Sequence, residues 1–251
     1  MIKVGLVGYG KAGKAVASVL AQDERFELCW IARRSNKPTA TEIPVTRLDK
    51  ATFSDWLASH PVDAVVDFSD SEAVLEYGEA IRRNGLMLVS AISSYSPETL
   101  AYIRELGREI RVMSSPNITL GINFLMLAAR LLRSIAPFAD VGIVEQHFRD
   151  KSEVSGTAKR IAKTLEVDEE EITSLRLGGI IGHHEVIFGF PHQTVRMIHD
   201  SIRREAFGTG AAFALSLLAT RPAGYYSYEE LLLDMMRQEL QRDGEQQPVD
   251  A

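Results

Sequence analysis

The sequence has a single cysteine, Cys29, among 251 residues. One cysteine can form no disulfide within the chain and cannot build a cysteine-rich zinc site. It lies in the apolar run 26–31, which is typical of a buried strand, so we expect it to be a packing residue. The chain also lacks an apolar run long enough to cross a bilayer, and glycines follow the first residues too soon for a signal peptide. We therefore expect a cytoplasmic protein.

An excess of positive charge is lacking as well, because the formal net charge is −6. Nucleic acids and anionic membrane surfaces are bound through concentrated basic faces. We therefore expect no nucleic-acid and no membrane partner, and a small molecule instead. A hydrophobic content of 45% is enough for a real core, and the length suits two modest domains.

Short apolar runs alternate with stretches of helical periodicity in the first 115 residues. The apolar runs are residues 2–7, 26–32, 62–68, 85–89 and 110–113. Alternation of strands and helices predicts a Rossmann-type parallel sheet with crossover helices. The fold class is therefore α/β for this part of the chain.

The pattern changes after residue 116, where a strongly apolar helix is predicted over 124–135. A strand near 141–146 and a helix from about 157 to 166 follow, and the acidic run 168–171 is expected to be a solvated helix start. Alternation typical of antiparallel strands then appears at 174–181, 185–190 and 193–199. We predict a second, α+β domain, with helix returning from about residue 207.

A glycine-rich turn follows the first predicted strand. It reads Gly8-Tyr9-Gly10-Lys11-Ala12-Gly13 and matches the pattern G-x-G-x-x-G. Glycines at this spacing allow a sharp turn and a close approach of the backbone to a pyrophosphate, which the N-terminus of the next helix then binds. The context of strand, turn and helix favours a dinucleotide site at these six residues over a purely structural turn.

Arg33 and Arg34 follow the second predicted strand. An acidic residue at this place accepts hydrogen bonds from the ribose 2′-hydroxyl of NADH, whereas an arginine meets the 2′-phosphate of NADPH. A solvated basic loop is one interpretation, and a guanidinium fork around a phosphate is the other. We favour the fork and expect NADPH to be preferred, with NADH possible.

The segment 144–158 places His147 and Lys151 in one loop ahead of Ser155-Gly156-Thr157, a predicted helix N-cap. The N-cap offers hydroxyl and backbone donors to a carboxylate, while the lysine and the histidine can bind an anion or move a proton. From chemistry alone, a structural loop with an ordinary cap explains these residues nearly as well.

Several segments together resemble the 4-hydroxy-tetrahydrodipicolinate reductase (dihydrodipicolinate reductase) family of the lysine and diaminopimelate pathway. Besides the glycine turn, residues 145–158 resemble the family's E-x-H-H-x-x-K motif with the S-G-T-A that follows it. Residues 65–69 resemble its I-D-F-T segment, and residues 115–123 resemble its A-N-F-S-x-G-V-N segment. Further along the chain, residues 182–186 resemble its G-x-H-x-V segment and residues 203–211 its S-R-x-x-F-A-x-G-A segment. The resemblance covers almost the whole chain. It implies a nicotinamide-dependent reductase acting on a small dicarboxylate or imino acid.

The resemblance also implies roles for individual residues. His147 corresponds to an acid/base and Lys151 to a proton-donating, substrate-binding lysine, so these two are the expected catalytic residues. The expected substrate-binding residues are Phe148, Ser155, Gly156, Thr157 and Arg204. The cofactor-binding residues that the resemblance adds to the turn and the arginines are Phe68, Ser69, Ala91, Ser93, Ser115 and Asn117.

In the family the N-terminal domain binds the cofactor, and the other domain binds substrate and forms a homotetramer through its open sheet. For this chain the resemblance implies a dinucleotide-binding domain of residues 1–116 with 207–251. Residues 117–206 would be the substrate-binding and oligomerisation domain.

Three departures from the family pattern bear on the substrate. Phe148 replaces the second histidine, residues 153–157 lack the proline and one residue of D-A-P-S-G-T, and residues 91–94 replace the G-T-T-G loop. Each leaves the reductase fold intact and affects only the choice of substrate.

Three functions compete at this point. The leading one is hydride transfer from NADPH to the cyclic imino acid 4-hydroxy-tetrahydrodipicolinate. A divergent relative that reduces another small imine or carbonyl acid is the second, and a catalytically silent cofactor-binding regulator is the third. Retention of His147 and Lys151 argues against the third. We expect no metal, because His183 and His184 have no other ligands at metal-site spacing.

Overall fold

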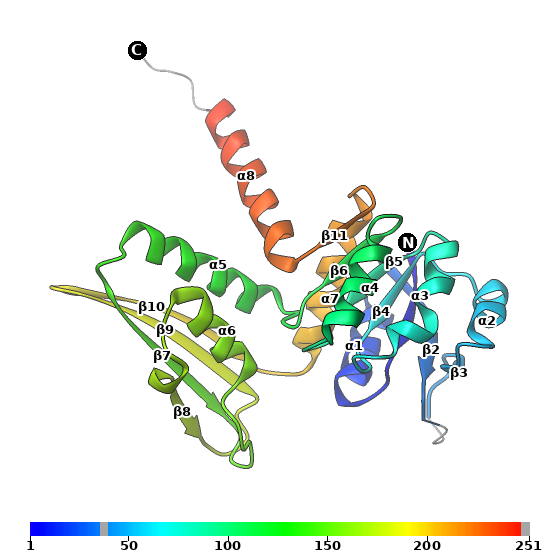
Figure 1. The fold of residues 1–251 in the computed structure, drawn as a ribbon, viewed down its shortest axis with the longest axis horizontal. Coiled ribbons are helices and arrows are strands. Elements are labelled where there is room, and N and C mark those ends of the chain that lie inside the picture. Colours follow the sequence, from blue (N-terminus) through cyan, green and yellow to red (C-terminus); the bar gives the residue numbers. More distant parts are fainter. Residues whose placement is uncertain (36–39, 247–251) are drawn as a thin grey trace. The chain divides into compact units, whose positions relative to one another are not determined.

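The computed structural model describes residues 1–35 and 40–246, with side chains up to residue 242. The chain forms two compact units, one of residues Met1–Ile118 with Phe207–Ala251 and the other of Thr119–Ala206. Each unit has its own sheet (Figure 1). No helix within the described ranges is long and apolar enough to span a membrane.

The first unit is built on a seven-stranded sheet in which every pairing is parallel. Its order is β11-β6-β5-β4-β1-β2-β3. The strands are β1 (Ile2–Val7), β2 (Phe26–Arg33), β3 (Val45–Arg47), β4 (Ala64–Asp67), β5 (Met87–Ser90), β6 (Arg111–Ser114) and β11 (Gly224–Tyr226). The order reverses between β1 and β4, the place where doubly wound sheets bind ligands at the carboxyl ends of their strands. The predicted α/β class is confirmed.

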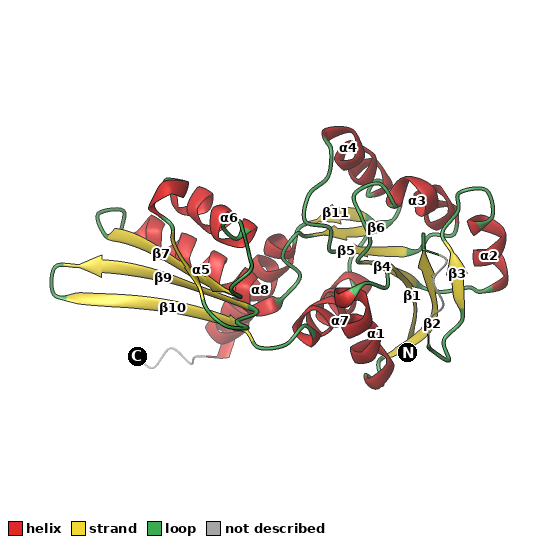
Figure 2. Cartoon of the chain, turned by 90° about the horizontal axis from the view of Figure 1, so that it is seen from below, coloured by secondary structure: helices red, strands yellow, loops and turns green. Residues whose placement is uncertain are grey.

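Helices cover both faces of this sheet. The helices of this unit are α1 (Lys11–Gln22), α2 (Phe53–Ser59), α3 (Val74–Arg83), α4 (Pro97–Leu106), α7 (Glu205–Ala219) and α8 (Tyr228–Gln246). Figure 2 shows α1 and α7 on one face, and α3 and α4 on the other. Close packing of α7 on α1 requires Gly208, because a Cβ there would lie 2.6 Å from the Cβ of Val19.

Aromatic side chains fill the core of the first unit beside β1. Trp30 of β2 is fully buried and donates from Nε1 to the carbonyl of His60 at 3.0 Å. Its ring occupies the space beside Gly5 of β1, where a Cβ would come within 2.1 Å of it. Phe53 packs edge-on against the same ring, with centroids 5.6 Å apart. Large aromatic groups of this kind dominate the burial that stabilises a core.

The second unit is a four-stranded sheet in the order β10-β9-β7-β8, with two helices packed on one face. The elements are α5 (Leu120–Ile135), β7 (Asp140–His147), α6 (Gly156–Leu165), β8 (Thr173–Arg176), β9 (Gly182–Phe190) and β10 (Gln193–Ser201). The predicted α+β character of this part is confirmed, since β9 pairs antiparallel with both β7 and β10.

One local prediction in this unit was wrong. The stretch 174–181 is not an antiparallel strand: β8 ends at Arg176 and pairs parallel with β7. The chain then turns through Gly178, whose φ of +48° lies in the left-handed region that favours glycine. The acidic run, predicted to be a solvated helix start, forms an exposed 3₁₀ helix, Glu169–Glu171, between α6 and β8.

Strand alternation places the polar residues of β7 among apolar ones. Ile143, Glu145 and His147 are all buried and lie on the face that α5 and α6 cover. Residues at i and i+2 of a strand share a face, which is why two titratable groups stand together beneath the helices. This end of β7 leads directly into the loop that carries Lys151.

Candidate active site

The turn after β1 has the form that a phosphate site needs. Gly8 has φ +92°, and a Cβ on it would come within 2.6 Å of the backbone of Phe68 and Ser69. A Cβ on Gly13 would lie 2.2 Å from the carbonyl oxygen of Gly8. Beside Gly10, in contrast, nothing lies within 4 Å. Two glycines are therefore required by packing, and the third leaves the backbone open to a ligand.

The start of α1 is electrostatically suited to an anion. Gly10 is its N-cap, no side chain caps the helix, and the first turn contains no acidic residue. The first N–H groups and the positive end of the helix dipole are thus left for a ligand. Lys11 and Ala12 belong to this first turn and Tyr9 precedes it, so all six predicted residues are contiguous here.

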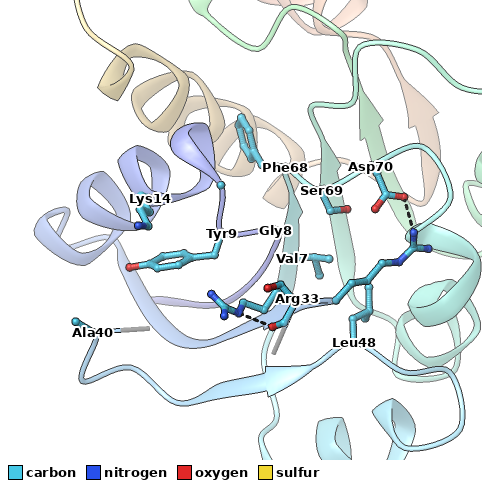
Figure 3. Close-up of a pocket in the computed structure, with 13 residues that line it drawn as sticks. Val7, Gly8, Tyr9, Lys14, Arg33, Ala40, Leu48, Phe68, Ser69 and Asp70 are labelled. Atoms are coloured by element: carbon cyan, nitrogen blue, oxygen red, sulfur yellow. Dashed lines mark hydrogen bonds and ion pairs between the residues drawn. The ribbon is translucent and has the colours of Figure 1, made fainter. Parts of the chain in front are cut away.

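A cavity of about 660 Å³ opens over this turn (Figure 3). Its lining residues are Val7, Gly8, Tyr9, Gly10, Lys14, Arg33, Arg34, Ser35, Ala40, Leu48, Phe68, Ser69 and Asp70. The volume is in the range of small-molecule and cofactor pockets. Seven residues predicted to bind the cofactor from three separate segments are therefore brought together: Gly8, Tyr9, Gly10, Arg33, Arg34, Phe68 and Ser69.

The two arginines after β2 differ in their surroundings. The Arg33 Nε donates to the carbonyl of Ser35 at 2.9 Å, and its side chain extends along the cavity (Figure 3). Arg34 forms ion pairs with Asp70 at 3.1 Å and Glu76 at 2.5 Å. Two carboxylates therefore hold the guanidinium of Arg34 beside the cavity.

A buried carboxyl group holds the segment that faces Gly8. Asp67, at the end of β4, accepts hydrogen bonds from the Ser69 backbone N–H at 2.9 Å and the Ser69 hydroxyl at 2.5 Å. The Tyr77 hydroxyl donates to its other oxygen at 2.6 Å. Burial raises the pKa of Asp67 to about 6, although the hydrogen bonds from Ser69 and Tyr77 oppose that rise. The contacts fix the backbone at Phe68 and Ser69.

The remaining predicted cofactor residues lie at the ends of β5 and β6. The Ala91 N–H donates to the carbonyl of Asp67, and Ser93 is exposed in the loop that follows. The Ser115 N–H donates to the carbonyl of Ser90 at 2.9 Å, and its hydroxyl donates to the carbonyl of Asn117 at 2.7 Å. The four predicted residues here, Ala91, Ser93, Ser115 and Asn117, are outside the lining of the cavity described above. They continue the same carboxyl edge of the sheet.

In the second unit, the carboxylate of Glu145 lies at the centre of a hydrogen-bonded cluster. It is fully buried and accepts from His147 Nδ1 at 2.5 Å and from the Ser155 backbone N–H at 3.3 Å. Ser174 and Arg176 of β8 donate to it as well. Burial alone would raise the pKa of Glu145, but the hydrogen bonds from Arg176, Ser174 and His147 lower it to about 2.

Two buried histidines lie beside this carboxylate. Burial lowers the pKa of His147 below 6.5, opposed by the hydrogen bond to Glu145. The ring of His184 lies edge-on to it with centroids 5.4 Å apart, and its Nε2 shares a 2.9 Å hydrogen bond with the Ser155 hydroxyl. Burial lowers the pKa of His184 to about 3. Both rings are therefore neutral at pH 7.

The predicted carboxylate clamp lies at the N-terminus of α6. Ser155 is the N-cap and its hydroxyl accepts from the Ala158 N–H at 3.5 Å. Gly156 is exposed, with nothing within 4 Å of the place of a Cβ, and Thr157 is half-buried next to it. The first turn of α6 contains no acidic residue. As in α1, an anion can therefore approach the helix N-terminus.

The loop between β7 and α6 carries Lys151, which is half-buried, and Phe148, whose side chain is 41% exposed. An exposed aromatic ring beside a polar cluster can contact a ligand without disturbing the core. Arg204 is exposed in the turn before α7. His147, Lys151 and Ser155 are thus brought into one polar region of the second unit.

Sequence reasoning missed three residues of this cluster, Glu145, Arg176 and His184. Arg176 and Glu145 are 31 positions apart, and His184 and Ser155 are 29 apart, so spacing alone could not pair them. Strand alternation places Glu145 on the same face as His147. Glu145 and His184 also lie in the segments 145–158 and 182–186 that carry the family resemblance. No group of three or more candidate metal ligands occurs in the described parts of the chain.

Comparison with known proteins agrees with this arrangement. The family model "Dihydrodipicolinate reductase, N-terminus" matches residues 2–118, and "Dihydrodipicolinate reductase, C-terminus" matches residues 118–232. A 4-hydroxy-tetrahydrodipicolinate reductase of Clostridium perfringens (strain ATCC 13124) is 30% identical over 259 residues, covering 92% of this chain and 98% of that protein. One of Caldanaerobacter subterraneus subsp. tengcongensis is 29% identical, covering 89% and 94%.

Among solved structures, a dipicolinate-bound dihydrodipicolinate reductase from Paenisporosarcina sp. TG-14 superposes with a TM-score of 0.78. It is 23% identical to this chain, and the match covers 90% of this chain and 97% of that one. The fold is therefore shared along nearly the full length of both chains. With both family models matched over residues 2–232, the chain belongs to the dihydrodipicolinate reductase family.

Proposed function

We propose that this protein reduces 4-hydroxy-tetrahydrodipicolinate with NADPH as the preferred hydride donor. The observation that carries the proposal is the loop between β7 and α6, where an imidazole, an ammonium group and an open helix N-terminus occur within 11 residues, 147–157. Relatives that match most of the chain bear the name of this activity. A reductase acting on a dicarboxylate needs both an anion clamp and a proton source, and this loop offers both.

The cofactor supplies the hydride when it is bound. Gly8, Gly10 and Gly13 fit its pyrophosphate, because the backbone beside Gly10 is open and the α1 N-terminus offers backbone donors. Ser69 lines the same cavity, and Ala91, Ser93, Ser115 and Asn117 would extend the site along the sheet edge. NADH remains a usable but poorer donor in this proposal.

Preference for NADPH rests on Arg33 and Arg34, where an acidic residue would favour NADH. Arg33 lines the cavity and would bind the 2′-phosphate. Arg34, held by Asp70 and Glu76, would add positive potential and keep the segment after β4 in place. We assign the discrimination to Arg33 and Arg34 together.

Substrate carboxylates would bind at the N-terminus of α6. Gly156 and Thr157 carry the first N–H groups of the helix, Ser155 caps it, and the space beside Gly156 is open. Arg204 would bind a second carboxylate, and Phe148 would contact the ring of the substrate. Both side chains are exposed, so each can reach a ligand without leaving a packed position.

Proton transfer is assigned to the same loop. 4-Hydroxy-tetrahydrodipicolinate becomes a conjugated imine when it loses its hydroxyl group as water. Hydride addition to one carbon of that imine then leaves negative charge, which a neighbouring carbon discharges by taking a proton. Lys151 carries three N–H donors and a charge that attracts a carboxylated substrate. His147 is neutral at pH 7 because burial lowers its pKa, so it orients or accepts rather than donates.

The domain roles follow from these assignments. The unit with the glycine turn would bind the dinucleotide and the unit with the Glu145 cluster would bind substrate. The sheet face of the second unit that α5 and α6 leave uncovered exposes Leu175 and Ile198, which suits assembly into a homotetramer.

One observation favours a second candidate substrate. Phe148 stands at the position of the second histidine in the family motif described above. The proposed substrate pocket therefore has an apolar ring in place of one polar group. An imine or carbonyl acid with a less polar ring would fit such a pocket.

The test is NADPH oxidation with freshly generated 4-hydroxy-tetrahydrodipicolinate beside a panel of other cyclic imino acids. We expect kcat/KM for the named substrate to exceed that of every panel member by at least about tenfold, or roughly 1.4 kcal/mol of transition-state binding. A higher value for another imino acid would assign the protein to the divergent group instead.

A further inference from the structure

The Glu145 cluster connects elements that are far apart in the sequence. The side chain of Glu145 has no solvent exposure, yet five hydrogen bonds reach its two oxygens. They come from β7 itself, from the N-cap of α6 and from β8. A carboxylate with this many donors is ionised, and burial without them would make it neutral.

Arg176 supplies two of those bonds and uses the rest of its guanidinium on the loop. Its Nη2 and Nη1 donate to Glu145 at 2.7 and 3.0 Å. Its Nε donates to the carbonyl of Lys151 and its Nη2 to the carbonyl of Glu153, both at 2.9 Å. A fifth bond goes to the carbonyl of Leu175, its chain neighbour. Lysine has no such fork of fixed donors.

The loop has few other attachments among the described residues. The Arg149 N–H donates to the carbonyl of Gly178 at 3.1 Å, and the Lys151 N–H donates to the carbonyl of Phe148 within the loop. Arg176 therefore makes the contacts that tie Lys151 and Glu153 to β8. This side chain therefore helps to hold the backbone that carries the proposed proton donor.

The cluster also decides which nitrogen of His147 carries the proton. An ionised carboxylate can only accept, so Nδ1 of His147 is the donor in its 2.5 Å contact with Glu145. In the neutral ring Nε2 is then an acceptor. The space beside Nε2 is provided by Gly182, where a Cβ would lie 3.3 Å from that atom.

We propose that Glu145 and Arg176 are positioning residues: Glu145 holds His147 with an accepting Nε2, and Arg176 holds the Lys151 loop against the same carboxylate. The proposal rests on the proposed function and assigns separate roles to Lys151 and His147. Lys151 donates the proton, and His147 Nε2 accepts a hydrogen bond from the substrate or from the Lys151 ammonium. Both groups are oriented by one buried carboxylate.

A merely structural ion pair would stabilise the unit without affecting His147, so the test needs a readout specific to the ring. We would measure ¹⁵N chemical shifts of the His147 ring in the full-length protein, assigned with a His147→Gln variant. In the parent at pH 7.5 we expect a protonated Nδ1 and an unprotonated Nε2. A proton on Nε2 in the parent overturns the proposal without the need for any variant at Glu145 or Arg176.

Two conservative variants and a control complete the test. Glu145→Gln removes the charge that fixes the ring, and we expect a mixed tautomer signal and a loss in kcat of about 10- to 100-fold. Arg176→Lys keeps the charge but loses the contacts to the loop, so we expect KM for the substrate to rise while the His147 tautomer is retained. Ser174→Ala removes one hydrogen bond to the same carboxylate and is expected to change kcat less than about threefold.

NADPH affinity is expected to stay within about twofold of the parent in all three variants, because none of them touches the glycine turn. A folded Glu145→Gln protein with parental kcat and an unchanged tautomer overturns the proposal, as does a Ser174→Ala variant as impaired as Glu145→Gln. If the parent reduces no cyclic imino acid at all, the proposed function fails, whereas the tautomer prediction is still decided by the ring shifts.

Discussion

Variants of the glycine turn should affect NADPH binding and protein stability differently, depending on which glycine is replaced. Gly10 has φ −75° and ψ −161°, which any residue adopts, and nothing lies within 4 Å of the place that a Cβ would take. Gly10→Ala should therefore change the free energy of unfolding by no more than about 0.5 kcal/mol. The added methyl group would nevertheless occupy the place where a pyrophosphate approaches. We expect the Kd for NADPH to rise at least about tenfold, or roughly 1.4 kcal/mol.

Gly13→Ala is the matched contrast. Its methyl group would lie 2.2 Å from the Gly8 carbonyl oxygen, so backbone must move on one side or the other. Overpacking of this kind costs about 1–3 kcal/mol, and we expect a loss of stability of that size. Urea unfolding and isothermal titration with NADPH on both variants give the two quantities. A Gly10→Ala protein that binds NADPH as tightly as the parent would refute the assignment of this turn to the cofactor.

The other predictions concern the proposed roles of single side chains. Lys151→Ala should lower kcat at saturating substrate by about 10²–10⁴-fold with little change in NADPH affinity, as expected for loss of a general acid; a variant that reaches the parental rate would make Lys151 a binding residue. Changing Arg33 and Arg34 together to alanine should remove the preference for NADPH over NADH in titrations. Phe148→His should alter substrate KM more than NADPH affinity. Burial lowers the pKa of His184 from 6.5 to about 3 in the folded protein, so the unfolded chain takes up this proton first as the pH falls. The free energy of unfolding should therefore decrease between about pH 6.5 and pH 3, by roughly 1.4 kcal/mol per pH unit from this group. The variant His184→Gln should show a smaller decrease over the same range.

The apolar runs in the sequence were enough to predict the central strands of the first unit, because these strands are buried on both faces. Runs such as 62–68 and 110–113 are largely apolar, and the glycine turn marks where β1 ends. Short edge elements have no such pattern. β3 and β11 have three residues each and lie at the two edges of the sheet, where partial exposure removes the apolar run.

The end of β8 shows where alternation misleads. Leu175, Leu177 and the residues up to 181 keep the apolar spacing of a strand, but the chain leaves the sheet after Arg176. The pair Gly178-Gly179 was the signal of a turn, and it outweighs alternation because Gly178 takes a positive φ.

In the second unit, the sequence identified the part of the candidate site that is contiguous along the chain. His147, Lys151 and Ser155 lie in one loop, so chemistry and motif identify them together. The partners that hold them come from β8 and β9, and only the folded sheet brings Arg176 and His184 next to β7. The spacing of residues in a single sequence does not predict which distant residues pair in this way.

Isotope transfer tests the central claim most directly. The protein would be incubated with NADPH deuterated at the transferable position and with 4-hydroxy-tetrahydrodipicolinate, and the product examined by NMR. The proposed reaction predicts one deuterium from the cofactor on a ring carbon, and, in a parallel reaction in D₂O, a solvent deuteron on the neighbouring carbon. Cofactor oxidation without deuterium in the product, or an unaltered substrate after prolonged incubation, would contradict the assignment of this protein as a reductase of that imino acid.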